Sequence, residues 1–334
     1  MNERERVMNA LEFNTIDKVP YHLDFTVPAR NKMIQYLNDQ NFEQNIGNHL
    51  AFTKALPLDA FQEVKPGFIR DEWGVVWNRT IDPDIGNPIP VFSQPILKGY
   101  RFPDPDDPRR FQALPAFLEK NKDKFCILKM SYSLFERTWS LRGMENVLTD
   151  MITNPEFIED LMDHITQYNL RVISKALDIG FDGVYFGDDW GWQRGLIMGP
   201  AMWRKFIKPR MGQMYASIKN RGRKVFLHCC GKVDELFPDL IEIGLDVFNP
   251  FQPEVMDIFA IKKHYQGKLS FYGGIGIQSL LPFGTVDEVK RGVQNILDVI
   301  GKNGGYIASP SHALPKDIPC ENILAMLDVL KNQS

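Results

Sequence analysis

The regular alternation of strand-like and helix-like segments along the 334 residues is the feature that most limits the folds open to this chain. Eight short apolar runs have the composition of buried strands, and amphipathic helical patterns lie between most of them. The strands are predicted at 19–25, 60–64, 125–132, 183–187, 224–228, 246–249, 269–273 and 305–309. The clearest helices are predicted at 155–178, 200–220, 233–243, 286–300 and 320–331. Eight such units predict an α/β protein with a single (β/α)8 TIM barrel over residues 1–334.

One segment breaks this alternation between the second and third predicted strands. Residues 68–79 alternate apolar and polar side chains on both sides of Trp73-Gly74. This pattern predicts a β-hairpin inserted after strand two, over the barrel mouth. Trp73 and Trp77 then either wall a pocket or pack on the sheet below. A doubly wound open sheet is the alternative fold, but no Gly-x-Gly-x-x-Gly turn follows the first strand.

Polar residues gather at the predicted carboxyl ends of the strands, where (β/α)8 barrels carry their functional groups. A single polar residue at such a place more often has a structural role, with its hydrogen bonds made within the protein, than a functional one. Several of them at the same end of the barrel suggest a functional site. The candidate substrate-binding residues are Asp24, Trp190, Gln193, Asn249, Gln252 and Tyr272.

Asp188 and Asp189 end the fourth predicted strand and are the candidate catalytic residues. Successive strand residues face opposite sides, so only one of the two points into the mouth unless the chain is already turning. Such a carboxylate could protonate a leaving oxygen or orient His228. The alternative is a helix cap or a loop hydrogen bond.

The run Val225-Phe-Leu-His228-Cys229-Cys230-Gly231 reads as a buried strand that opens onto a metal site. Residues i and i+2 of a strand share a side, so His228 and Cys230 converge while Cys229 faces away. Imidazole and thiolate both suit Zn²⁺, which makes zinc the first candidate.

Composition excludes several classes of protein. Four cysteines in 334 residues, two of them adjacent, imply no disulfide framework and suit a reducing cytoplasm. The charged, periodic amino-terminal segment contains no apolar run long enough for a signal peptide or a membrane span, so no membrane association is expected. A formal net charge of −3 suggests no polyanion-binding surface, and nucleic acid is not an expected partner.

Nearly end to end, the chain resembles the uroporphyrinogen decarboxylase superfamily of (β/α)8 barrels. The resemblance rests on several short motifs in a fixed order: Arg4-Glu-Arg-Val-Met-Asn-Ala-Leu11, Asp17-Lys-Val-Pro20, Gly187-Asp-Asp-Trp-Gly191, Phe206-Ile-Lys-Pro209, His228-Cys-Cys-Gly231, Gly244-Leu-Asp-Val-Phe-Asn-Pro250, Phe283-Gly-Thr-Val-Asp-Glu-Val289, Gly305-Tyr-Ile through His312, and Pro319-Cys-Glu-Asn-Ile323. Individually weak, these motifs in this order are specific to the superfamily.

The superfamily has two branches, and the chain departs from the decarboxylase branch. Decarboxylases share an Arg-Gln-Ala-Gly-Arg segment, whose guanidinium groups hold the substrate carboxylates through bidentate pairs. Here only Arg30 and Lys32 remain in that segment. The decarboxylases also need no metal and lack the His-x-Cys strand end. Both departures argue against porphyrin chemistry.

The other branch, the corrinoid-dependent methyltransferases, is similar to this chain at His-x-Cys-Gly. Its members bind zinc through His, Cys and a second Cys near the end of strand eight. Here His312 takes the place of that last ligand, so the resemblance implies a zinc site of His228, Cys230 and His312 with a position left for substrate. Cys320 is the poorer candidate.

The resemblance implies a corrinoid-protein-dependent methyltransferase in which zinc activates an O-methyl substrate, such as an aryl methyl ether, for methyl transfer to cob(I)alamin. No Asp-x-His-x-x-Gly signature occurs in the chain, so the corrinoid is expected on a separate carrier protein. Methylcobalamin:thiol methyl transfer, a metal-free decarboxylase and a catalytically silent barrel are the alternatives. A homodimer is compatible with the resemblance.

Overall fold

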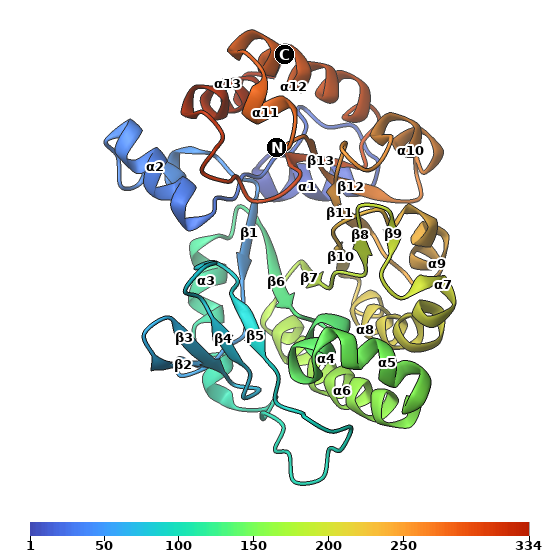
Figure 1. The fold of residues 1–334 in the computed structure, drawn as a ribbon. Helices are drawn as coiled ribbons and strands as arrows, with labels where there is room; N and C mark the ends of the chain where they lie inside the picture. The colour runs from blue at the N-terminus through green and yellow to red at the C-terminus, as the bar shows by residue number, and fades with distance from the viewer. Residues whose placement is uncertain (334) are drawn as a thin grey trace.

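A computed structural model describes residues 1–333, in which seven parallel strands form one curled sheet (Figure 1). The strands run in the order β1-β6-β7-β10-β11-β12-β13. Their bounds are β1 (Leu50–Thr53), β6 (Phe125–Ser131), β7 (Gly183–Gly187), β10 (Lys224–His228), β11 (Val247–Phe251), β12 (Ser270–Ile275) and β13 (Tyr306–Pro310). Six of the eight predicted strands therefore lie in this sheet within about two residues of their expected bounds.

The predicted first strand, 19–25, does not form a regular strand. It contributes only isolated parallel bridges, Tyr21 to Ala308 of β13 and Phe25 to Leu314. Its Leu23 amide donates to the Asn48 side chain (2.8 Å) instead of to a neighbouring strand. The Tyr21 carbonyl accepts from the His49 amide, next to β1 (3.1 Å). The segment thus lies between β13 and β1, and the sheet has seven strands where eight were predicted.

The predicted second strand is wrong in position. Residues 61–65 form β2 (Phe61–Lys65), which is exposed and lies outside the curled sheet. The second place belongs instead to β1, whose Phe52 lies opposite Ile127 of β6. Residues 61–65 do form a strand, but an antiparallel one in a separate sheet.

The segment predicted as a hairpin belongs to a four-stranded antiparallel sheet of β2, β3 (Phe68–Asp71), β4 (Val76–Asn78) and β5 (Asn87–Ile89). Strands β3 and β4 pair antiparallel, with Phe68 opposite Asn78. A two-stranded sheet is formed by β8 (Gly191–Trp192) and β9 (Gly195–Leu196).

Most helices lie on the outer side of the curled sheet (Figure 1). The helices predicted at 286–300 and 320–331 are confirmed with the same bounds, and the region predicted at 200–220 is interrupted by a π turn at Trp203–Ile207. Their bounds are α1 (Glu3–Leu11), α2 (Val27–Leu37), α3 (Leu114–Lys120), α4 (Phe135–Arg142), α5 (Met144–Thr153), α6 (Pro155–Ile179), α7 (Gly199–Met202), α8 (Lys208–Lys219), α9 (Phe237–Glu242), α10 (Ile258–His264), α11 (Leu280–Phe283), α12 (Val286–Ile300) and α13 (Cys320–Lys331).

The two faces of the curled sheet pack against different partners. Side chains of the inner face, among them Phe125, Phe226 and Ile307, form one small apolar cluster that Val7 and Leu11 of α1 complete. The outer face packs against the helices in a much larger cluster. The inner cluster is closed by α1, which leaves the opposite ends of the strands free to carry polar groups.

Stability is expected to fall as the pH drops from 7 towards 4, because His49 is buried in its neutral form. Its Nε2 accepts from Arg6 Nη1 (2.9 Å), and burial together with the Arg6 charge lowers the pKa of His49 to about 4. An unfolded histidine has a pKa of about 6.5, so the unfolded chain binds the extra proton in this window and the loss reaches about 2–3 kcal/mol. Urea unfolding at several pH values measures it.

A His49→Gln variant should lose part of this pH dependence. The part that remains is expected from His22, whose pKa burial also lowers to about 4. If the stability of His49→Gln depends on pH as steeply as that of the unaltered chain, buried His49 is not a source of the pH dependence.

Candidate metal centre

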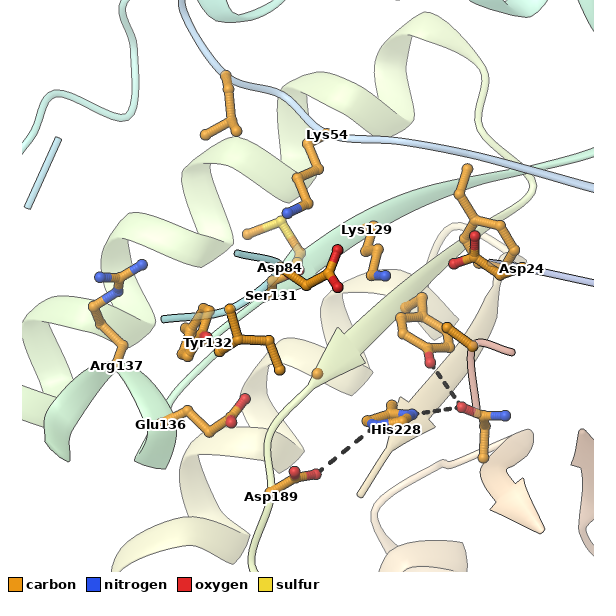
Figure 2. Close-up of a pocket in the computed structure, with 18 of the residues that line it drawn as sticks. Asp24, Lys54, Asp84, Lys129, Ser131, Tyr132, Glu136, Arg137, Asp189 and His228 are labelled. Carbon is orange, nitrogen blue, oxygen red and sulfur yellow. Dashed lines mark hydrogen bonds and ion pairs between the residues drawn. The ribbon is translucent and has the colours of Figure 1, made fainter. Parts of the chain in front are cut away.

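A cavity of about 720 Å³ opens at the carboxyl ends of the parallel strands. Its walls come from the curled sheet, from the four-stranded sheet and from helix α6. Trp73 and Trp77 are both buried and both line it. Figure 2 shows the charged residues that point into this space.

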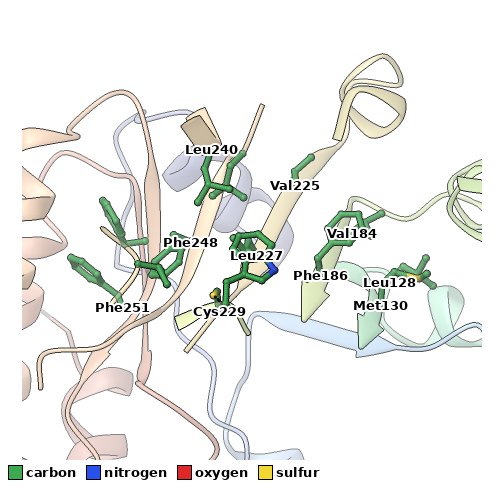
Figure 3. Close-up of a cluster of buried hydrophobic side chains, with 14 of the residues drawn as sticks. Leu128, Met130, Val184, Phe186, Val225, Leu227, Cys229, Leu240, Phe248 and Phe251 are labelled. Carbon is green, nitrogen blue, oxygen red and sulfur yellow. Dashed lines mark hydrogen bonds between the residues drawn. The ribbon is translucent and has the colours of Figure 1, made fainter. Parts of the chain in front are cut away.

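Strand β10 ends at the candidate ligand His228, and the second candidate, Cys230, follows two residues later. His228 pairs laterally with Gly187 and Asn249 on the neighbouring strands and faces the inner side, where it lines the cavity. Cys229 points the other way and is buried among outer-face side chains such as Phe248 (Figure 3). The Trp190 amide donates to the Cys229 sulfur (3.1 Å). The prediction that Cys229 faces away from the site is confirmed.

His228, Cys230 and His312 come together at the cavity wall. One potential ligand atom from each lies within 4.8 Å of the others. The Cys230 Sγ is 3.3 Å from His228 Nε2, and the rings of His228 and His312 are centred 5.6 Å apart. Two ligands of a tetrahedral zinc are about 3.5 Å apart, given bond lengths of roughly 2.0 Å to nitrogen and 2.3 Å to sulfur. The spacing therefore fits a metal ion, and three protein ligands leave a fourth position open.

Asn249 of β11 fixes which nitrogen of His228 faces the other ligands. The Asn249 Nδ2 group donates to the Tyr272 carbonyl (2.9 Å), so its Oδ1 is the acceptor for Tyr185 Oη (2.7 Å) and for His228 Nδ1 (2.6 Å). The proton of the neutral imidazole therefore sits on Nδ1. The lone pair of Nε2 is directed towards Cys230. Metal-binding histidines commonly hold their tautomer in this way.

Asn249→Ala is expected to weaken zinc binding 10- to 100-fold, which is the usual cost of removing a group that orients a metal ligand. Without the Asn249 Oδ1 acceptor, His228 can exchange tautomers and rotate. Competition with a zinc chelator measures the affinity. Tyr272→Phe is the control, because Asn249 contacts the Tyr272 carbonyl and not its side chain. An equal loss in both variants would contradict the role of Asn249.

The protonation states of the two strand ligands are set mainly by burial. Burial lowers the pKa of His228 in spite of the opposing Asp189 carboxylate, so the ring is neutral and able to bind a metal. Burial, reinforced by Asp189 and Glu136, raises the pKa of the Cys230 thiol. A metal ion bound here must displace that proton.

The two candidate catalytic aspartates have different surroundings. Asp188 is fully buried and lies outside the cavity lining; its carboxylate accepts from the backbone amides of Leu134, Phe135 and Glu136 at the start of α4 and from Trp190 Nε1 (2.6–3.1 Å). Burial raises the pKa of Asp188 to about 6, although all four donors oppose that change. Asp189 lines the cavity, accepts from the Cys230 amide (2.8 Å) and approaches His228 Nε2 to 4.0 Å.

Three of the six candidate substrate-binding residues line the cavity and three do not. Asp24, Asn249 and Tyr272 line the cavity. The other three lie outside its lining: Trp190 is fully buried against Trp203, Gln193 is exposed in the turn between β8 and β9, and Gln252 is buried after β11.

Of the charged cavity residues that lie outside the predicted site residues, three bear on the chemistry of the site. They are Lys54 directly after β1, Lys129 within β6 and Glu136 in the first turn of α4. A single lysine inside the apolar run Phe125-Cys-Ile-Leu-Lys-Met was an available signal for Lys129. No sequence signal pointed to Lys54, because strand β1, which precedes it, was not predicted.

A curled parallel sheet with a polar cavity at the carboxyl ends of its strands defines the TIM-barrel-like class of α/β proteins. Within that class, the family model for uroporphyrinogen decarboxylase (URO-D) matches residues 89–333, and the chain belongs to this family.

Relatives of two kinds are similar to the chain. The methylcobamide:CoM methyltransferase MtaA of Methanosarcina barkeri is 22% identical over 176 residues, 53% of this chain and 49% of that protein. The uroporphyrinogen decarboxylase of Wigglesworthia glossinidia brevipalpis is 22% identical over 268 residues, 76% of this chain and 71% of that protein. The chain spans about half the length of the first curated relatives it matches. The family thus includes both methyltransferases and decarboxylases.

A solved methyltransferase from Methanosarcina mazei has the same fold. It superimposes with a TM-score of 0.74 at 16% identity and covers 99% of this chain and 98% of its own. Separately, no helix among residues 1–333 is both long and apolar enough to cross a membrane.

Proposed function

We propose that this protein is a corrinoid-protein-dependent methyltransferase that takes a methyl group from an O-methyl substrate. The observation that carries the proposal is the convergence of His228, Cys230 and His312 on one point of the cavity wall, with the His228 tautomer set by Asn249. A metal-free decarboxylase needs no thiol beside His228, so the Cys230 Sγ at 3.3 Å from His228 Nε2 favours a metal site.

Zinc held by these three residues would supply a Lewis acid that stabilises the oxygen from which the methyl group departs. The protein's own groups would do the rest. Burial, with the charges of Asp189 and Asp188, raises the pKa of the cavity residue Glu136 well above its ordinary value, so a proton is available at its carboxyl group for the leaving oxygen. Asp189 holds the Cys230 backbone in place through the amide hydrogen bond.

The walls of the cavity would bind the remainder of a small methylated substrate. Asp24 and Tyr272 would contact the substrate, and Trp73 and Trp77 would supply apolar surface. The corrinoid would arrive on a separate carrier protein. We also propose that the protein is cytoplasmic and that it forms a homodimer.

A carboxy-lyase of the uroporphyrinogen decarboxylase type is the second candidate. Two cavity lysines, Lys54 and Lys129, favour it, because they could bind a substrate carboxylate. They lie on different elements from the arginines on which decarboxylases rely, and they are few for an octacarboxylate.

A methyl-donor screen tests the proposal. Purified zinc-loaded protein is incubated with cob(I)alamin and aryl or alkyl methyl ethers, and methylcobalamin is followed by absorbance. Formation of methylcobalamin with at least one ether is expected. Release of CO2 from a porphyrinogen carboxylate, with no methyl transfer from any ether or to any thiol, would favour the second candidate instead.

A further inference from the structure

Two lysines without partners share one wall of the cavity. The register of the parallel strands pairs Thr53 with Leu128, which makes Lys54 and Lys129 the next residues along two neighbouring strands. Laterally adjacent residues of a sheet point to the same face. Ile127, two residues before Lys129, belongs to the inner cluster, and Phe52, two before Lys54, packs against it. Both ammonium groups are therefore directed into the cavity, as Figure 2 shows.

Neither lysine is neutralised by the protein. Among residues 1–333, no carboxylate lies within ion-pair distance of either ammonium group, and neither side chain donates a hydrogen bond. Arg79 also lines the cavity, and its Nε is buried without a hydrogen-bond partner. Loss of hydration and the charges of Lys129, Arg137 and Arg79 lower the pKa of Lys54 to about 8. Lys54 is exposed and Lys129 is half-buried, so both ammonium groups are open to an anion that enters the cavity.

Three acidic residues of the cavity have polar partners other than the two lysines. Asp24 lies 4.0 Å from Arg30, and the Asp84 carboxylate accepts from the Val27 amide (3.2 Å). Asp189 binds the Cys230 amide (2.8 Å). Arg137, by contrast with the lysines, is paired with Asp71 (2.7 Å).

The Tyr185 ring lies near both Lys129 and His228. The Lys129 Nζ is 5.6 Å from the centre of the Tyr185 ring, and the same ring is 6.0 Å from that of His228. Figure 2 shows Lys54, Lys129 and the Asp84 carboxylate on one side of the cavity and His228 and Asp189 on the other. A ligand with an anionic group at one end and an ether oxygen at the other, about one ring apart, matches this arrangement.

We propose that the methyl donor carries a carboxylate that binds between Lys54 and Lys129 while its methylated oxygen faces His228, Cys230 and His312. Neighbouring strands are about 4.8 Å apart, so one carboxylate reaches both ammonium groups. The substrate class is thus a small methoxy acid. The assignment of the oxygen rests on the proposed function, whereas the assignment of the carboxylate rests on the lysines alone.

Calorimetric titration of zinc-loaded protein with 3-methoxybenzoate and with its neutral analogue 3-methoxybenzamide tests the proposal. The acid is expected to bind about 10- to 100-fold more tightly than the amide, as for a charge-assisted contact in a partly dehydrated site. Lys54→Met and Lys129→Met should each reduce that preference at least about fivefold and leave the zinc content unchanged. Lys54→Arg should retain most of it. Lys98→Met, which removes an exposed lysine away from the cavity, should retain all of it.

Equal binding of acid and amide, failure of both to bind, or a preference that survives in the Lys54→Met/Lys129→Met double variant would overturn the proposal. Its failure can be told apart from that of the proposed function. Lysine-dependent preference for the acid without methyl transfer to cob(I)alamin removes the methyltransferase assignment and leaves the anion site standing. Methyl transfer from neutral ethers but not from methoxy acids removes only the anion site.

Discussion

Cys230→Ala and His228→Ala are each expected to weaken zinc binding at least about 100-fold. Removal of a group that merely orients a ligand costs 10- to 100-fold, and removal of the ligand itself should cost more. His228 and Cys230 are two of the three clustered potential ligands, so loss of either leaves only two. The affinity is measured by competition with a chelator of known zinc affinity, and methyl transfer should be lost in parallel.

Cys320→Ser is the matched control for this experiment. Cys320 is buried at the start of α13 and is absent from the cluster of potential metal ligands, so the variant should bind zinc as the unaltered chain does. His312→Ala should also lose affinity, because His312 completes the cluster. Tight binding of one zinc ion by Cys230→Ala would contradict the ligand assignment.

Asp188→Ala should destabilise the fold by about 4 kcal/mol. The change leaves four buried donors without an acceptor, three backbone amides at the start of α4 and the Trp190 indole. Each unsatisfied buried donor costs about 1–3 kcal/mol, and partial relaxation reduces the sum. Urea unfolding followed by circular dichroism measures the difference.

The adjacent aspartate provides the comparison. Asp189→Ala removes one acceptor, that of the Cys230 amide, from a side chain that is 36% exposed, and should cost less than about 1.5 kcal/mol. Similar stabilities for the two variants would contradict the structural role of Asp188. A large loss of methyl transfer in Asp189→Ala with little loss of stability would agree with its position in the cavity.

The strands and helices that carry a strong local signal could be predicted from the sequence. Helix α12 has a Thr285 capping box and a periodic apolar face, which together define its bounds in the sequence. Strand β10 is an uninterrupted apolar run that ends in His228. Alternation along that strand was enough to separate His228 and Cys230 from Cys229.

Features that depend on contacts distant in the sequence could not be predicted. Asp188 stabilises the start of α4, 52 to 54 residues earlier in the chain, and no local pattern distinguishes that role from a catalytic one. Strand β1 has only four residues, so its signal is weak, and Lys54 was missed with it. The segment 19–25 looks like a strand, yet the Asn48 side chain takes the place of a strand partner at Leu23.

Methyl transfer that depends on zinc is the most direct measurement of the central claim. The protein is mixed with cob(I)alamin and a ¹³C-methyl ether, and the label on the corrinoid is followed by NMR before chelation, after chelation and after zinc is restored. We expect transfer that chelation abolishes, that zinc restores, and that Cys230→Ala cannot recover. Transfer that proceeds equally well after chelation, or no transfer with any ether in the presence of bound zinc, would contradict the account.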